Sequence, residues 1–122
     1  MKIDELSIGD WLQDNYYNAH NVKIAAISKR SIREEKFEVW RPFRFLTPIQ
    51  ITPEILEKNG FTKSKTFVEW KYEEEGIYIL CKPFPFLKIE TENVQLNLSG
   101  CEYVHELQHA LRLCGIEKDI IV

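Results

Sequence analysis

The segment TFVEWKY, residues 66–72, alternates between two kinds of side chain: Val68, Trp70 and Tyr72 fall on one side and a mostly charged set on the other. A period of two is the repeat of a β-strand, whose successive side chains point to opposite faces. Short strands separated by turns pair with their neighbours in the chain, so this region predicts an antiparallel meander. Its further strands are expected at Gly76–Cys81, Phe86–Thr91 and Val94–Leu98.

The N-terminal half also predicts strands. A turn at Ile8–Asp10 leads into an extended segment, and Val22–Ile27 is short and apolar. Lys36–Arg41 alternates with a period of two, and Pro42 ends it or confines it to a sheet edge. We expect a curved antiparallel sheet here, or a small, partly open β-barrel of the SH3-like kind.

Two helices are predicted, at about 52–59 and 100–114. Thr52 can cap the first, Pro53 suits its first position, and Asn59-Gly60 ends it. For the second, Ser99 is the expected cap, and Glu102 would return a bond to the backbone of Ser99. The pattern as a whole predicts an α+β fold, a sheet packed with two helices.

The second predicted helix carries an apolar stripe with helical spacing. Its members lie at intervals of three and four residues and should face the sheet, whereas the polar residues between them should line the other side. Ile120–Val122 would then add a last strand. The stripe comprises Val104, Leu107, Leu111 and Cys114.

Composition indicates one domain over residues 1–122. The chain is 44% hydrophobic, enough for one core, and its net charge of −3 argues mildly against nucleic acid as its main partner. The three cysteines have no C-x-x-C spacing, the N-terminus lacks the apolar run of a signal peptide, and no segment reaches the length of a membrane span. We therefore expect a cytoplasmic protein without a membrane partner, and the oligomeric state stays open.

One segment is locally basic. Between residues 29 and 44, six basic side chains accompany three acids, so the remainder of the chain is acidic. Such a segment is a solvated hairpin face or a surface for an acidic partner, and aromatic side chains nearby suit either a peptide or single-stranded nucleic acid. The candidate partner surface consists of Lys29, Arg30, Arg33, Lys36, Arg41 and Arg44, with Tyr16 and Tyr17.

The segment HELQH, residues 105–109, has the H-E-x-x-H spacing of zinc proteases. His105 and His109, one helical turn apart, can bind one zinc ion, and Glu106 can act as general base on a bound water. Zinc needs a third protein ligand, but the positions that extend the motif hold Arg112 and Gly115. We therefore expect no metal, cofactor or catalytic residue, and keep a zinc hydrolase as the alternative.

Three segments carry a resemblance that covers nearly the whole chain: IGDWLQ, LTPIQITPEILEKNGF and VHELQHALRLCGIEKDI. They resemble a group of small uncharacterised proteins of Bacteroidetes and their phages or mobile elements. In such proteins the last helix often reads V-H-x-L-Q-N, with asparagine in place of His109. The resemblance implies an accessory protein without an established activity, so it transfers no functional residue.

The expected function is that of a small binding or interaction module, with the basic segment as its contact surface. The sequence leaves open whether the partner is a protein or a nucleic acid. The alternatives are the zinc hydrolase and a nucleic-acid-binding β-barrel.

Overall fold

The computed structural model describes residues 1–16, 18–65, 69–82 and 86–122. The chain divides into two compact units, Met1–Ile49 and Gln50–Val122. Each unit holds an antiparallel sheet of five strands, and both α-helices belong to the second unit. The predicted α+β class is confirmed, whereas one domain over 1–122 stays a prediction.

The sheet of the first unit has the strand order β4-β3-β2-β1-β5. Two short 3-10 helices accompany it, η1 (Ile3–Glu5) and η2 (Phe43–Phe45). Leucine, isoleucine and valine side chains on its inner face form a core with Leu6. The strands are β1 (Trp11–Asp14), β2 (His20–Ile27), β3 (Ser31–Glu34), β4 (Trp40–Pro42) and β5 (Leu46–Pro48).

The first sheet is open. Its edges are β4 and β5, and within the described residues it does not close into a barrel. This arrangement is consistent with the expected curved antiparallel sheet. Each edge strand is only three residues long and ends at a proline, Pro42 or Pro48. Because proline has no N–H to donate, it cannot continue a hydrogen-bonded ladder.

The predicted strand Lys36–Arg41 is mostly wrong. β3 lies earlier, at Ser31–Glu34, and a turn follows it before β4 begins at Trp40. Glu38 has a positive φ of 55°, which reverses the chain direction. A period of two is present in Lys36–Arg41, but backbone reversal at Glu38 overrides it.

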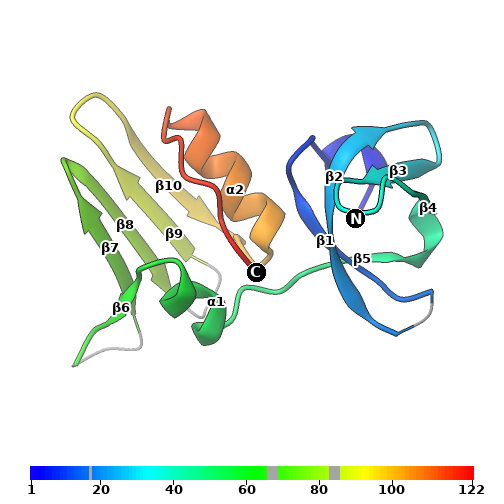
Figure 1. Ribbon diagram of the computed structural model, residues 1–122. Coiled ribbons are helices and arrows are strands. Elements are labelled where there is room, and N and C mark those ends of the chain that lie inside the picture. The colour runs from blue at the N-terminus through cyan, green and yellow to red at the C-terminus, as the bar shows by residue number, and fades with distance from the viewer. Residues whose placement is uncertain (17, 66–68, 83–85) are drawn as a thin grey trace. The chain divides into compact units, whose positions relative to one another are not determined.

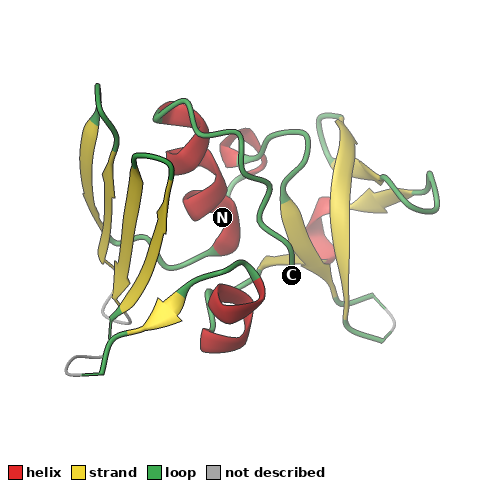
Figure 2. Cartoon of the chain, turned by 60° about the vertical axis from the view of Figure 1, so that its left-hand side comes forward, coloured by secondary structure: helices red, strands yellow, loops and turns green. Residues whose placement is uncertain are grey.

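The sheet of the second unit has the order β10-β9-β8-β7-β6, and α2 lies along one of its faces (Figures 1 and 2). The predicted meander is confirmed where the structure describes it, although residues 66–68 and 83–85 lie outside the described residues. The elements are α1 (Pro53–Lys58), β6 (Thr62–Lys63), β7 (Trp70–Glu74), β8 (Ile77–Lys82), β9 (Phe86–Glu90), β10 (Gln95–Ser99) and α2 (Val104–Leu113).

One row of paired residues crosses the whole second sheet. Directly paired residues of neighbouring strands point to the same face. Lys63 pairs with Trp70, Trp70 with Cys81, Cys81 with Leu87, and Leu87 with Leu98. The register therefore brings a lysine, an indole and a thiol from three strands to one side of the sheet.

The start and end of α1 agree with the prediction. Thr52 is the N-cap, and its hydroxyl accepts a hydrogen bond from the backbone N–H of Ile55 at 3.3 Å. Pro53 follows, and Asn59 and Gly60 end the helix, with Gly60 at a φ of 88°.

α2 begins at Val104, later than predicted, and Ser99 is not its cap. Ser99 ends β10, and Gly100 has a φ of 88°, which turns the chain away from the strand. The carboxylate of Glu106 instead accepts the backbone N–H groups of Glu102 and Tyr103, at 3.1 and 3.0 Å. The capping carboxylate is therefore four residues further along than expected.

The apolar stripe of α2 is confirmed, because Val104, Leu107, Leu111 and Cys114 are all buried. The expectation that the polar residues line an exposed side is wrong for two of them. His105 and Gln108 are each only 4% exposed, whereas the apolar Leu113 is 77% exposed. The buried surface of α2 is therefore wider than the stripe.

The C-terminal segment does not form the predicted last strand. Two buried amide side chains hold it in place of a sheet ladder. Gln108 accepts the N–H of Ile120 at 2.7 Å and donates to the carbonyl of Lys118 at 2.8 Å. Asn59 accepts the N–H of Ile121 at 2.8 Å and donates to the same residue's carbonyl at 2.7 Å.

Gln108→Ala should destabilise the protein by about 1–3 kcal/mol, because it leaves the buried N–H of Ile120 without an acceptor. Urea unfolding followed by circular dichroism measures the change. The exposed Gln95 is the matched control, and Gln95→Ala should stay within about 0.5 kcal/mol of the parent. Equal losses in the two variants would show that Gln108 does not anchor the segment.

Candidate functional site

The predicted partner surface separates into two ends of the first sheet. Lys29 and Arg30 lie in the turn between β2 and β3, where the Arg30 carbonyl accepts the N–H of Phe43 at 2.9 Å. Lys36 lies in the turn between β3 and β4, beyond the other end of β3. The basic residues therefore do not form one continuous patch.

Arg41 is withdrawn from the surface into an ion-pair network. Its guanidinium donates to the carboxylate of Asp14 at 2.8 Å and to that of Glu34 at 2.5 Å. Both acids are almost completely buried. The network joins β1, β3 and β4, so Arg41 has a structural role that the sequence did not predict. Its contact role stays a prediction.

The pKa of Arg41 reflects these contacts. Burial by itself would lower it, but hydrogen bonds and charge attraction from Glu34 and Asp14 outweigh burial and raise the pKa above its ordinary value. Arg41 is thus a permanent cation that balances part of the buried negative charge.

Tyr16 and Arg44 both contact the Phe45 ring. The ring of Tyr16 lies 4.6 Å from that of Phe45, centroid to centroid, and the Arg44 guanidinium lies 4.8 Å from the Phe45 ring. Both side chains are exposed. Tyr17, the other predicted aromatic, lies outside the described residues.

Three large apolar side chains are exposed on the β3–β4 hairpin. Phe37 is 60% exposed, Val39 47% and Trp40 49%. Trp40 pairs directly with Arg33, so both point to the same side of the sheet, and the Lys36 ammonium lies 5.2 Å from the Phe37 ring. We call Arg33, Lys36, Phe37, Val39 and Trp40 the hairpin surface. Phe37 and Val39 were not part of the predicted partner surface, because their alternation with charged residues resembled a strand.

The HELQH residues lie on α2 as predicted, but His105 and Glu106 make contacts that stabilise the fold. The His105 ring is buried, stacks on Tyr103 with centroids 6.0 Å apart, and meets the His109 ring at 5.8 Å. The Glu106 carboxylate accepts two backbone N–H groups at the helix start. A general base beside a metal would need that carboxylate turned to the metal-bound water.

A zinc site would need a third ligand beside His105 and His109. In the part of the chain that the structure describes, no group of three or more His, Cys, Asp or Glu side chains is placed to hold a metal ion. Zinc binding by His105 and His109 and catalysis by Glu106 stay the untested alternative, to which this geometry adds no support.

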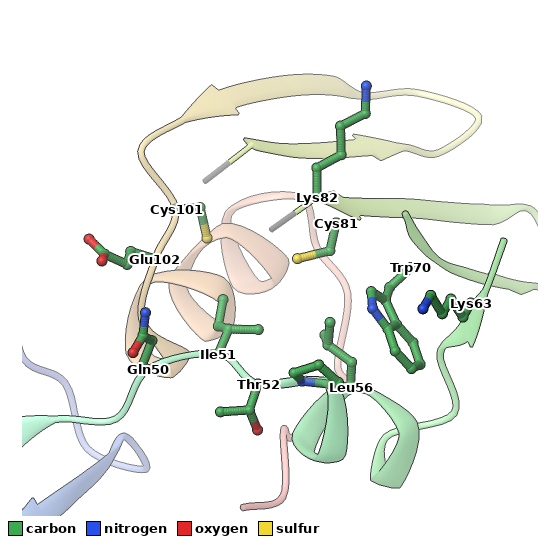
Figure 3. A pocket seen from close by; sticks show the side chains of 11 residues that line it. Gln50, Ile51, Thr52, Leu56, Lys63, Trp70, Cys81, Lys82, Cys101 and Glu102 are labelled. Atoms are coloured by element: carbon green, nitrogen blue, oxygen red, sulfur yellow. The ribbon is translucent and has the colours of Figure 1, made fainter. Parts of the chain in front are cut away.

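A cavity of about 200 Å³ lies in the second unit, between α1, the strands β6–β8 and the segment before α2. Two of the sequence's three cysteines line it, and Figure 3 shows the sulfur atoms of Cys81 and Cys101 both turned into it. Of the nine other lining residues, four are apolar, two are uncharged and polar, two are lysines and one is a glutamate. The lining residues are Gln50, Ile51, Thr52, Pro53, Leu56, Lys63, Trp70, Cys81, Lys82, Cys101 and Glu102.

The thiols of the cavity are neutral near pH 7. Burial raises the pKa of Cys81 to about 11. Burial, with the charges of Cys81 and Glu106, raises the pKa of Cys101 to about 12. All three cysteines are free and buried, as expected for reduced thiols. Sequence spacing alone could not bring Cys81 and Cys101 together, because strand register and the turn at Gly100 place them.

Comparison with protein-family models, curated proteins and solved structures finds no match to this chain. Among the described residues, no helix is both long and apolar enough to cross a membrane.

Arg41→Met should destabilise the protein by about 3–5 kcal/mol, because it leaves two buried carboxylates without their cation. Urea unfolding measures the loss, with Arg44→Met, at an exposed arginine, as control within about 0.5 kcal/mol of the parent. Adding Asp14→Asn and Glu34→Gln to Arg41→Met should recover part of the stability. Absence of recovery would mean that lost packing, not unbalanced charge, causes the loss.

Cys81 and Cys101 should react with iodoacetamide at pH 8 about ten-fold or more slowly in the folded protein than in guanidinium chloride, because a raised pKa reduces the reactive thiolate. Mass spectrometry of the alkylated peptides gives the rate for each residue. Rates in the folded protein should climb as the pH rises toward 11. Equal rates in folded and unfolded protein at pH 8 would contradict the burial of these thiols.

Proposed function

We propose that the chain is a small interaction module that binds an acidic, partly apolar segment of another protein through the hairpin surface. The observation that carries the proposal is the exposure of Phe37, Val39 and Trp40 within four positions of one hairpin. Large apolar side chains exposed close together in one hairpin are candidates for a binding site, and tryptophan and arginine are enriched among the residues that dominate binding energy.

Charge supports an acidic partner. Residues 1–49 carry eight basic and seven acidic side chains, but Asp10, Asp14 and Glu34 are buried and Arg41 belongs to the ion-pair network. Without these four residues, the first unit has seven basic and four acidic side chains. The surface of the first unit is thus more basic than its total charge indicates, and complementary charge speeds and orients association.

The same surface favours protein over nucleic acid. Val39 has no ring on which a base could stack. Aliphatic groups beside mixed charges match a protein interface better. Nucleic-acid binding is therefore the alternative outcome of the test.

The cellular setting is part of the proposal. The resemblance to small proteins of Bacteroidetes and their phages supports an accessory protein of bacterial or phage origin. Free, buried cysteines support a reducing compartment such as the cytoplasm.

The test is selection of displayed random peptides on the immobilised full chain, followed by affinity measurement with the enriched peptides in solution. We expect peptides that combine Asp or Glu with aromatic or aliphatic residues. The double variant Phe37→Ala with Trp40→Ala should weaken their binding about ten-fold or more, since both side chains would lie at the interface centre. Circular dichroism checks that the variant keeps its fold.

Leu113→Ala is the matched control, because Leu113 is an exposed apolar residue of the other unit. It should change affinity by less than about two-fold. Equal effects of the control and the double variant, or enriched peptides without acids, would refute the proposal. Binding of a single-stranded 20-nucleotide DNA that falls steeply with salt would replace it by the nucleic-acid alternative.

A further inference from the structure

The cavity of the second unit is a second candidate site, and it shares no residue with the hairpin surface. Its volume of about 200 Å³ exceeds the volume of about 150 Å³ at which an apolar protein cavity holds one benzene molecule. One aromatic ring or one short branched chain, with a small polar group, therefore fits.

The walls favour an apolar body. Ile51 and Leu56 line one side, and the indole of Trp70 lines another. Pro53 is a further apolar lining residue. Cys81 and Cys101 add soft, uncharged thiols. Ligand sites of this kind bury an apolar body and orient it with few polar groups.

The polar groups favour a negative charge on the ligand. Lys63 and the indole N–H of Trp70 are both donors, and they come from neighbouring positions of β6 and β7. In the described part of the chain no carboxylate forms an ion pair with Lys63.

The other two charged lining residues do not compete for the cavity. Lys82 pairs with Glu69 at 3.3 Å, and Figure 3 shows its ammonium pointing away from the cavity. The Glu102 carboxylate also points away. One cation, Lys63, is thus left to balance a ligand charge.

We propose that this cavity binds a small monocarboxylate with an aromatic or branched apolar body, the carboxylate lying toward Lys63 and Trp70 and the body among Ile51, Leu56 and the two thiols.

Phenylacetate is the probe, and phenylacetamide and phenethylamine are its neutral and cationic counterparts. Titration of the full chain, labelled with ¹⁵N and observed by NMR, reports both affinity and location. We expect phenylacetate to saturate with a Kd on the order of 1 mM, as suits so small a ligand. Shifts should concentrate on the residues that line the cavity. Phenylacetamide should bind about three-fold more weakly or worse, and phenethylamine more weakly still.

Lys63→Gln should remove the preference for the acid over the amide. The matched control is Lys71→Gln, because Lys71 is next to Trp70 in β7 and so points to the opposite face of the sheet. It should leave the preference unchanged. Cys101→Leu should fill part of the cavity and weaken both ligands, and the Lys63 comparison stands even if that variant does not fold.

The absence of saturable shifts at 20 mM phenylacetate, roughly twenty times the expected Kd, would overturn the proposal. Equal affinity for phenylacetate and phenylacetamide, or tighter binding of phenethylamine, would also overturn it. So would an equal loss of the preference for the acid in Lys71→Gln and Lys63→Gln. Failure here leaves the hairpin proposal intact, since Phe37 and Trp40 do not line the cavity.

Discussion

The first unit depends on the contact of Arg41 with Asp14 and Glu34. Burying these charges is costly, and only their mutual attraction and hydrogen bonds offset that cost. The three residues lie on different strands, and a slip of any strand by one position would turn its charge to the other face of the sheet. We infer that the network selects the register, and that this register also sets Trp40 beside Arg33 on the outer side.

Periodicity predicted most of the helices and strands, but not the long-range contacts that fix where α2 begins and how Arg41 is paired. The strands of the meander and the cap of α1 follow from local signals, because a period of two and Thr52-Pro53 act within a few residues. The cap of α2 could not be predicted, because both Ser99 and Glu106 can accept hydrogen bonds from backbone N–H groups at a helix start. The positive φ of Gly100 decides between them. The ion-pair network of Arg41 could not be predicted for a related reason, because its partner Asp14 is distant in sequence.

The same limit applies to the candidate sites. The HELQH spacing is visible in the sequence, yet in the structure Glu106 is engaged at the helix start and His105 is buried against Tyr103. The cavity has no motif, because Lys63, Trp70 and Cys81 become neighbours only through cross-strand pairing. The candidate binding site therefore lies at cross-strand neighbours that no sequence motif connects, and not at the HELQH motif.

The hydrogen bonds of the Asn59 and Gln108 side chains to the C-terminal segment bear on how the second unit folds. Asn59 and Ile121 are 62 positions apart, whereas Gln108 and Ile120 are 12 apart. Closing a longer loop costs more chain entropy, and contacts between distant positions slow folding. We expect the hydrogen bonds of Gln108 to the C-terminal segment to form together with α2, and those of Asn59 to form last. Packing of α1 against the C-terminal segment would then complete the folding of the second unit.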